Sequence, residues 1–268
     1  MNTNLFWFSG TGNTLWAAGA LATQLGQTNL VPIASPAATN APPVQRVGVA
    51  FPVYSWGPPA IVNRFLDQVR VAPGGYVFLL LTAGGDAGSA ARIAERRLKA
   101  RGIEVASSFT IKLPDNYPPL GGAPALPKQQ RMFERSIEQV KSAAAAIQAS
   151  TRDHIEVGRW IFRAMGRLAY PFFITHAAAM DKGFRADDKC NGCGLCARLC
   201  PVGDIEMSDA PGDAARPRWL HRCEQCFACL HWCPQAAIQF GRRSASQGRY
   251  HHPQVTLADL MPARGADQ

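Results

Sequence analysis

The stretch Leu5-Phe6-Trp7-Phe8-Ser9-Gly10-Thr11-Gly12-Asn13-Thr14 decides the fold of the first half of the chain. Its first four residues are all apolar, as expected of a strand that is buried on both faces. Apolar residues at helical spacing follow as far as about Leu25, so the Gly/Ser/Thr-rich turn joins a strand to a helix. The stretch therefore predicts the first unit of an α/β fold with parallel strands.

The rest of residues 1–150 repeats this alternation of strand and helix. Apolar runs at 29–33, 47–51, 76–82 and 103–113 predict four more strands, and helical patterns at 59–69 and 87–101 lie between them. Residues 34–45 are rich in Pro, Ala and Asn and are expected to form a loop. We therefore predict a doubly wound, five-stranded parallel sheet with helices on both faces, followed by a long helix at 127–150.

The turn between the first strand and its helix is suited to a phosphate group. Backbone amides at a helix start and the hydroxyls of Ser9, Thr11 and Thr14 can bind a phosphate dianion, and two glycines allow close approach. The turn lacks the lysine of a nucleoside-triphosphate loop, and Leu15 stands where a dinucleotide fingerprint requires a third glycine. A capped helix start without any ligand is the alternative.

The turn resembles the phosphate loop of the flavodoxin family, Ser/Thr-x-Thr-Gly-x-Thr, because Ser9, Thr11, Gly12 and Thr14 match its defining positions. The resemblance implies FMN bound noncovalently at the carboxyl ends of the strands. Two later loops fit the same family, and the aromatic rings of the first are expected to stack on the flavin. Without a ligand, these loops would be a surface cleft and an ordinary turn. The cofactor-binding candidates are Ser9, Gly10, Thr11, Gly12, Asn13 and Thr14, then Pro52, Val53, Tyr54, Ser55, Trp56 and Gly57, then Thr82, Ala83, Gly84 and Gly85.

All eight cysteines lie between Cys190 and Cys233, in two C-x2-C-x2-C-x3-C-P runs. Each cysteine of the first run has a counterpart in the second run at the same interval, the one that separates Cys190 from Cys223. This constant interval indicates a duplication. Disulfides do not account for this regular spacing, and structural zinc leaves the Cys-Pro that ends each run unexplained. The pattern indicates a metal-bearing module behind a cysteine-free domain.

The two runs resemble the bacterial two-cluster ferredoxins, in which the fourth cysteine of each run binds the other cluster. The resemblance implies two [4Fe–4S] clusters with crossed ligands. The first set is Cys190, Cys193, Cys196 and Cys233, and the second is Cys223, Cys226, Cys229 and Cys200. His221 and His231 flank these ligands, but eight thiolates leave no need for a histidine, and both are expected to be surface or packed residues.

The chain divides into a flavodoxin-like domain at 1–150, a helical linker at 151–185, a small α+β ferredoxin-like domain at 186–241 and a polar tail at 242–268. The linker is predicted to hold a helix at 154–170 that Pro171 ends, with Arg159, Arg163 and Arg167 on one face. A solvated face is favoured over contact with an acidic partner or peripheral contact with a membrane. Residues 202–222 are longer than a compact ferredoxin hairpin needs, so an exposed loop is expected at 209–217.

Composition limits the remaining functional classes. The chain has 268 residues, of which 47% are hydrophobic, and no run of about 18 apolar residues or secretory signal, so a cytoplasmic location is expected. The formal charge of +9 falls to about +3 once eight thiolates, two oxidised clusters and a flavin phosphate are counted. Without a recognised binding motif, this mild positive charge gives no reason to expect nucleic acid as a partner.

Over residues 1–241 the whole chain resembles the fused flavodoxin–ferredoxin proteins of bacteria and archaea, and the stretches 52–59 and 114–117 fit that resemblance. It implies intracellular electron transfer between redox partner proteins through two [4Fe–4S] clusters and FMN. The alternative is a flavin-dependent oxidoreductase that reduces a small molecule such as a quinone, nitro compound or tetrapyrrole precursor. A third hypothesis is a regulatory module that senses oxygen or iron. No catalytic acid, base or nucleophile is predicted.

Overall fold

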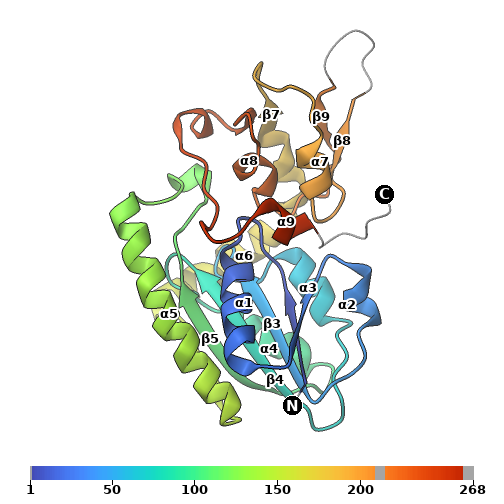
Figure 1. The fold of residues 1–268 in the computed structure, drawn as a ribbon, viewed down its shortest axis with the longest axis vertical. Helices are drawn as coiled ribbons and strands as arrows, with labels where there is room; N and C mark the ends of the chain where they lie inside the picture. Colours follow the sequence, from blue (N-terminus) through green and yellow to red (C-terminus); the bar gives the residue numbers. More distant parts are fainter. Residues whose placement is uncertain (1, 209–214, 262–268) are drawn as a thin grey trace.

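The computed structural model describes residues 2–208 and 215–261. Figure 1 shows a larger part built on a β-sheet and, above it, a smaller part that contains both cysteine runs. The C-terminal segment, drawn in red, returns from the smaller part to the top of the larger one, where it lies near helix α1 (Asn13–Leu25). Part of the loop expected at 209–217 lies outside the described residues, because the structure describes only 215–217 of it.

The larger part is an all-parallel sheet with the strand order β2-β1-β3-β4-β5-β6. The order 2-1-3-4-5 defines the doubly wound, flavodoxin-like fold, so the predicted fold class is confirmed. The strand count is corrected from five to six, because a two-residue strand adds to the edge of β5 at Ser107 and Ser108. The strands are β1 (Thr3–Trp7), β2 (Thr28–Pro32), β3 (Arg46–Pro52), β4 (Tyr76–Ala83), β5 (Val105–Lys112) and β6 (His154–Ile155).

Helices cover both faces of this sheet because the central strands are apolar on both sides. On β4, Phe78 and Leu80 pack into the cluster beneath α1 and α5 (Leu126–Gln148), whereas Leu79 and Leu81 pack beneath α3 (Ala60–Leu66) and α4 (Ala90–Lys99). The loop expected at 34–45 contains a short helix, α2 (Pro36–Asn40). Proline is compatible with the first turn of a helix. The Pro- and Asn-rich composition of this segment is nevertheless typical of a loop, so the sequence does not predict the helix.

The linker differs from its prediction at both ends. The expected helix at 154–170 is instead strand β6 followed by helix α6 (Trp160–His176). Glu156 fixes the strand, because its backbone N–H donates to Ser108 Oγ (2.8 Å) and its Oε2 accepts from the Thr110 N–H (2.7 Å). Pro171 does not end α6; it lies inside the helix at an exposed position, where water can take the place of the missing hydrogen bond. The 3-10 turn η2 (Ala178–Gly183) follows.

The smaller part consists of two halves that are related by the same sequence interval as the two cysteine runs. Its elements are β7 (Phe184–Ala186), α7 (Leu195–Leu199), β8 (Ile205–Met207), β9 (Pro217–Trp219), α8 (Ala228–His231) and β10 (Ile238–Phe240). The strands pair between the halves, β7 with β10 and β8 with β9, both antiparallel. Ile238 lies opposite Ala186, and Ile205 lies opposite Trp219, so the two pairings have the same register. The duplication that the sequence predicts is therefore present in the fold.

The remaining elements are short: η1 (Pro118–Leu120), η3 (Ser244–Ser246) and α9 (Leu257–Leu260). Among the described residues, no helix has both the length and the apolar character needed to cross a membrane.

Candidate redox site

The three loops predicted to bind flavin converge on one cavity of about 430 Å³ at the carboxyl ends of the strands. This position is where ligands bind in open α/β sheets. Of the sixteen candidates, fourteen line the cavity; Gly12 and Gly57 do not. Gly12 begins α1 with φ 92° and faces the tail at Val255, whereas a side chain on Gly57 would collide with the Tyr170 ring. Both glycines therefore serve packing behind the cavity wall.

One end of the cavity is polar and lies at the N-terminus of α1. Thr11 and Thr14 are buried there, and the Thr14 hydroxyl lies 2.7 Å from the hydroxyl of Thr82 on β4. Ser9 Oγ accepts a hydrogen bond from the Gly12 N–H (3.1 Å), which closes the turn. The first backbone N–H groups of a helix have no acceptor within that helix, so this end offers donors to an anion. It fits a phosphate group.

The other end is aromatic and is held in a tight turn. Tyr54 and Gly57 exchange two backbone hydrogen bonds of 2.9 Å, and Ser55 and Trp56 between them have φ of 48° and 64°. Two positive φ angles are typical of a type I′ turn, and non-glycine residues there store strain of about 1–3 kcal/mol each. Such strain persists where surrounding packing fixes the loop, as it does around Trp56.

Helix α6 supplies that packing and extends the aromatic wall. The Trp56 ring stacks on Phe162 (6.1 Å between centroids), and the Tyr54 ring meets Phe173 edge-on (6.3 Å). Both phenylalanines line the cavity. Burial, with smaller contributions from Cys226 and Glu224, raises the pKa of Tyr54 well above its usual value, so this tyrosine stays neutral. A neutral aromatic wall fits a flat, apolar ring system.

A third side of the cavity comes from the cysteine module, which no sequence pattern places there. Gln225, Cys226 and Phe227 of the second run line the cavity beside Gly10. A Cβ atom on Gly10 would lie 2.2 Å from the Cys226 carbonyl oxygen, and the Trp232 indole N–H donates to the Gly10 carbonyl (3.0 Å). The turn at residues 9–14 and the second cysteine run therefore pack backbone against backbone.

A buried carboxylate also joins the two parts. The Glu224 side chain is 2% exposed, accepts from the Ile61 N–H (2.8 Å) at the start of α3, and pairs with Arg64 (2.6 Å). A carboxylate is favoured at a helix N-terminus, where backbone donors are free. Because Glu224 follows Cys223 directly, the ion pair fixes the second cysteine run against the larger part.

The fourth side of the cavity is the loop after β5, which fits the family resemblance but holds none of the predicted site residues. Asn116 lines the cavity and donates from Nδ2 to Thr11 Oγ1 (2.7 Å). Its carbonyl oxygen accepts from His231 Nε2 (2.8 Å), and His231 Nδ1 accepts from the Tyr250 N–H (3.1 Å), which fixes the tautomer. Burial lowers the pKa of His231 to about 4, so it is neutral, as expected of a packed residue.

The C-terminal segment forms hydrogen bonds with the turn at residues 9–14. The His252 N–H donates to the Thr11 carbonyl (2.9 Å), and the Tyr250 hydroxyl donates to Asn13 Oδ1 (2.7 Å). The His252 ring is buried, lies parallel to Trp16 (4.8 Å) and meets Phe133 edge-on (4.9 Å). No sequence pattern assigns these tail residues a role, because they have neither helical nor strand periodicity.

The crossed ligand sets stay a prediction, and the electrostatic environment raises the pKa of two of the thiols. Burial raises the pKa of Cys196 to about 11, and the thiols that raise it further are Cys233, Cys190 and Cys193. Burial likewise raises the pKa of Cys229 well above its usual value, and Cys226, Cys223, Cys200 and Cys196 raise it further. No three His, Cys, Asp or Glu side chains among residues 2–208 and 215–261 are arranged to hold a single metal ion.

Backbone donors to sulfur follow the same repeat. The Asp204 N–H donates to Cys200 Sγ (3.1 Å), and the N–H of Ala237, at the equivalent position of the second half, donates to Cys233 Sγ (3.3 Å). Hydrogen bonds of this kind stabilise thiolate ligands and influence the potential of a bound cluster. The last cysteine of each run is thus held in the same way in both halves.

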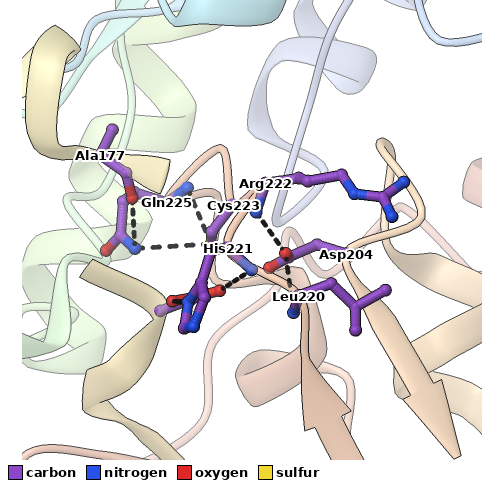
Figure 2. Close-up of polar contacts among 8 residues, drawn as sticks. Ala177, Asp204, Leu220, His221, Arg222, Cys223 and Gln225 are labelled. Carbon is purple, nitrogen blue, oxygen red and sulfur yellow. Dashed lines mark hydrogen bonds and ion pairs between the residues drawn. The ribbon is translucent and has the colours of Figure 1, made fainter. Parts of the chain in front are cut away.

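The surroundings of Cys223 distinguish the second run from the first. Figure 2 shows Gln225 between Cys223 and the end of α6, where its Nε2 donates to Ala177 O (3.2 Å) and to Cys223 Sγ (3.4 Å). The backbone N–H of Gln225 also donates to this sulfur (3.3 Å). Gln225 Oε1 is buried without a partner among the described residues, and the side chain lines the cavity. It is therefore available to accept a hydrogen bond from a bound group.

Two buried carboxylates, Asp204 and Asp181, bind the chain before this run, and Figure 2 labels the first of them. Asp204 Oδ1 accepts from the backbone N–H groups of Arg222 (2.6 Å) and Leu220 (3.2 Å). Asp181, which is fully buried, accepts from the His221 N–H (2.6 Å), and its Oδ1 lies 2.6 Å from His221 Nδ1. His221 is partly exposed, as expected, and serves to hold the chain before Cys223.

Comparisons with known proteins give one family match and several similar solved structures. Residues 182–234 match the family of 4Fe-4S dicluster domains. A flavodoxin from Streptococcus pneumoniae TIGR4 is 17% identical, with 56% of this chain and 100% of that chain covered and a TM-score of 0.42. A Megasphaera elsdenii flavodoxin is 16% identical, with 54% and 99% covered and a TM-score of 0.35. The flavodiiron core of a Synechocystis protein is 14% identical, with 56% and 36% covered and a TM-score of 0.39. No curated protein matches the sequence.

The strand order and the match to a dicluster domain define the class of protein. The chain joins a flavodoxin-like α/β domain to a ferredoxin-like 4Fe-4S domain, as the sequence predicts for a flavodoxin–ferredoxin fusion. This combination supports a redox role in electron transfer.

Proposed function

We propose that the chain transfers electrons between redox partner proteins through two [4Fe–4S] clusters and one noncovalently bound FMN. The observation that carries the proposal is Cys226, which belongs to a predicted cluster set and also lines the cavity formed by the three flavin loops. When bound, FMN exchanges one or two electrons and each cluster exchanges one, so the combination joins single-electron to two-electron partners.

The residues of the cavity have distinct roles in this proposal. Thr11, Thr14 and the first amides of α1 hold the phosphate, while Tyr54 and Trp56 hold the isoalloxazine ring. The backbone of the loop 82–85 faces the pyrimidine edge of that ring. The support for this orientation is the contrast between a polar, buried end and an aromatic end of the same cavity. A site with few polar groups at one end and an apolar wall elsewhere is typical of cofactor sites.

The two cysteine sets take different places in the proposed relay. Cys200 and Cys229 of the second set are buried, and Cys226 of that set reaches the cavity. In the first set Cys193 is exposed. We therefore assign the first set to exchange with an external protein and the second set to exchange with the cavity. The relay requires no catalytic acid, base or nucleophile.

Anaerobic purification followed by flavin identification and by counts of iron and sulfide tests the cofactor content. We expect FMN together with about eight iron and about eight sulfide per chain, as two cubane clusters require. Colourless protein that stays colourless after reconstitution would contradict the proposal.

The function is tested by mixing the reduced holoprotein with redox proteins and, separately, with small electron acceptors. Saturable oxidation by one small molecule alone would identify the flavin-dependent oxidoreductase instead.

A further inference from the structure

Helix α6 has an exposed apolar stripe on the side that faces away from the cavity. Phe162, Gly166, Tyr170 and Phe173 face the body of the protein, where they contact the Tyr54–Pro58 loop or line the cavity. Ile161, Met165, Leu168 and Phe172 are spaced by four, three and four residues, so they share another face of the helix. Leu168 is 83% exposed and Phe172 66%, and Trp160 at the start of the helix is 76% exposed. Contiguous exposed apolar side chains of this size mark interaction sites.

The charged side chains of α6 are all positive. Helix α6 contains no acidic residue, and Arg163 and Arg167 have no carboxylate partner among the described residues. A groove of about 720 Å³ runs between α6 and α4 and is lined by Trp160, Arg96, Arg163 and Arg167, together with Arg92, which pairs with Glu95 (2.8 Å). The surface therefore combines projecting apolar side chains with a basic groove.

We propose that α6 docks on an anionic phospholipid surface. The apolar stripe would enter the boundary between headgroups and acyl chains, and Arg96, Arg163 and Arg167 would bind lipid phosphates. Amphipathic helices with Trp, Phe and Leu on one side and arginines beside them bind membranes in this way. A second copy of the chain fits less well, because pairing two α6 helices would bring their arginines together without any carboxylate on α6 to neutralise them.

Docking at α6 places the redox cavity close to the lipid. Phe162 and Phe173 line the cavity from the inner side of the helix whose outer side carries Leu168 and Phe172. A helix with its side chains is about 10–12 Å across, so the cavity lies about one helix diameter from the membrane surface. The docking itself depends only on the surface of α6 and does not require that the cofactor assignment be correct.

Flotation of the purified holoprotein with phosphatidylcholine vesicles, with or without phosphatidylglycerol, tests the proposal. We expect binding only to vesicles with phosphatidylglycerol, and weaker binding at high salt. The double variant Leu168→Gln and Phe172→Gln is expected to bind at least tenfold more weakly. Arg163→Gln with Arg167→Gln is expected to lower binding about thirtyfold, since each basic residue near an anionic surface contributes about 1 kcal/mol.

The control is Leu126→Gln, which removes a leucine that is 76% exposed at the start of α5 and should leave binding unchanged. All the substituted side chains are exposed, so folding is expected to be retained, and near-ultraviolet circular dichroism verifies this. Equal binding by the wild type and the Leu168/Phe172 variant would overturn the proposal, as would no binding to anionic vesicles. A dimer in sedimentation that the same variant dissociates, with no vesicle binding, would assign the surface to a second copy instead.

Discussion

Gly10→Ala is the sharpest test of the packing between the two domains. The added Cβ would lie 2.2 Å from the Cys226 carbonyl oxygen and 3.1 Å from the Cys226 Cβ. Real Cβ atoms do not approach closer than 3.0 Å, so one of two backbone segments must move by about 0.8 Å. Gly10 is not among the residues with positive φ, so alanine there adds no conformational strain. Overpacking of this kind costs about 1–3 kcal/mol of unfolding free energy.

The matched control is Gly19→Ala in the same helix-and-loop unit. Nothing lies within 4 Å of a Cβ at Gly19, which is inside α1. Alanine in a helix interior is therefore expected to stabilise the protein by about 0.5–1 kcal/mol. Thermal unfolding of the holoprotein, recorded by circular dichroism at one scan rate, should show a midpoint about 2–12 °C lower for Gly10→Ala and slightly higher for Gly19→Ala. A Gly10→Ala midpoint equal to or above that of the wild type would refute the proposed backbone contact.

Three further outcomes follow from the site. Thr11→Ala with Thr14→Ala should weaken flavin retention and leave iron content unchanged, whereas Thr23→Ala, at an exposed position on α1, should change neither; unchanged retention in the double variant would disprove the phosphate assignment. Cys200→Ser, although in the first run, should damage mainly the cluster of Cys223, Cys226 and Cys229, as electron paramagnetic resonance can show. Burial lowers the pKa of His252 to about 4 in the folded protein, below an unfolded value of about 6.5. The stability that neutral His252 contributes is therefore fully present above about pH 6.5 and is lost as the pH falls towards 4. When the pH is lowered from about 7.5 to 5.5, the unfolding free energy of His252→Phe should fall by about 1.4 kcal/mol less than that of the wild type. Urea titrations at the two pH values measure this difference, and equal losses would show that His252 is not buried as a neutral ring.

The parts of the fold that the sequence predicts correctly are those with strong periodicity. Strands β1 to β5 are predictable because their apolar runs are bounded by turn residues, and the constant interval between paired cysteines indicates the duplication. Strand β6 escapes prediction because two residues, His154 and Ile155, have no period. The apolar stripe of α6 is visible in the sequence, but periodicity alone does not determine which side of a helix faces the core.

The site is predictable in part for a similar reason. Each flavin loop follows directly from a strand end, so the three loops are expected to meet at one sheet edge. The contacts that complete the cavity join residues far apart in the chain, such as Gly10 with Cys226 and Thr11 with Asn116. No local pattern encodes such contacts. The sequence assigns Gly10 to the access of a phosphate, whereas the structure shows that its missing side chain also admits the cysteine module.

The two cysteine runs differ where the second run meets the cavity. Gly192 and Gly194 have φ of 71° and 69°, and their counterparts in the second run, Gln225 and Phe227, keep the same left-handed conformation with φ of 54° and 56°. A non-glycine residue there costs about 1–3 kcal/mol. Burying a phenylalanine returns about 1.5–3 kcal/mol, and Phe227 is 3% exposed, so its burial offsets the strain of this position. Its ring packs against Phe184 and Phe240 of the smaller part and meets Tyr117 of the larger part edge-on. Gln225 and Phe227 therefore contribute side chains to the cavity wall, which the glycines at the equivalent positions of the first run could not do.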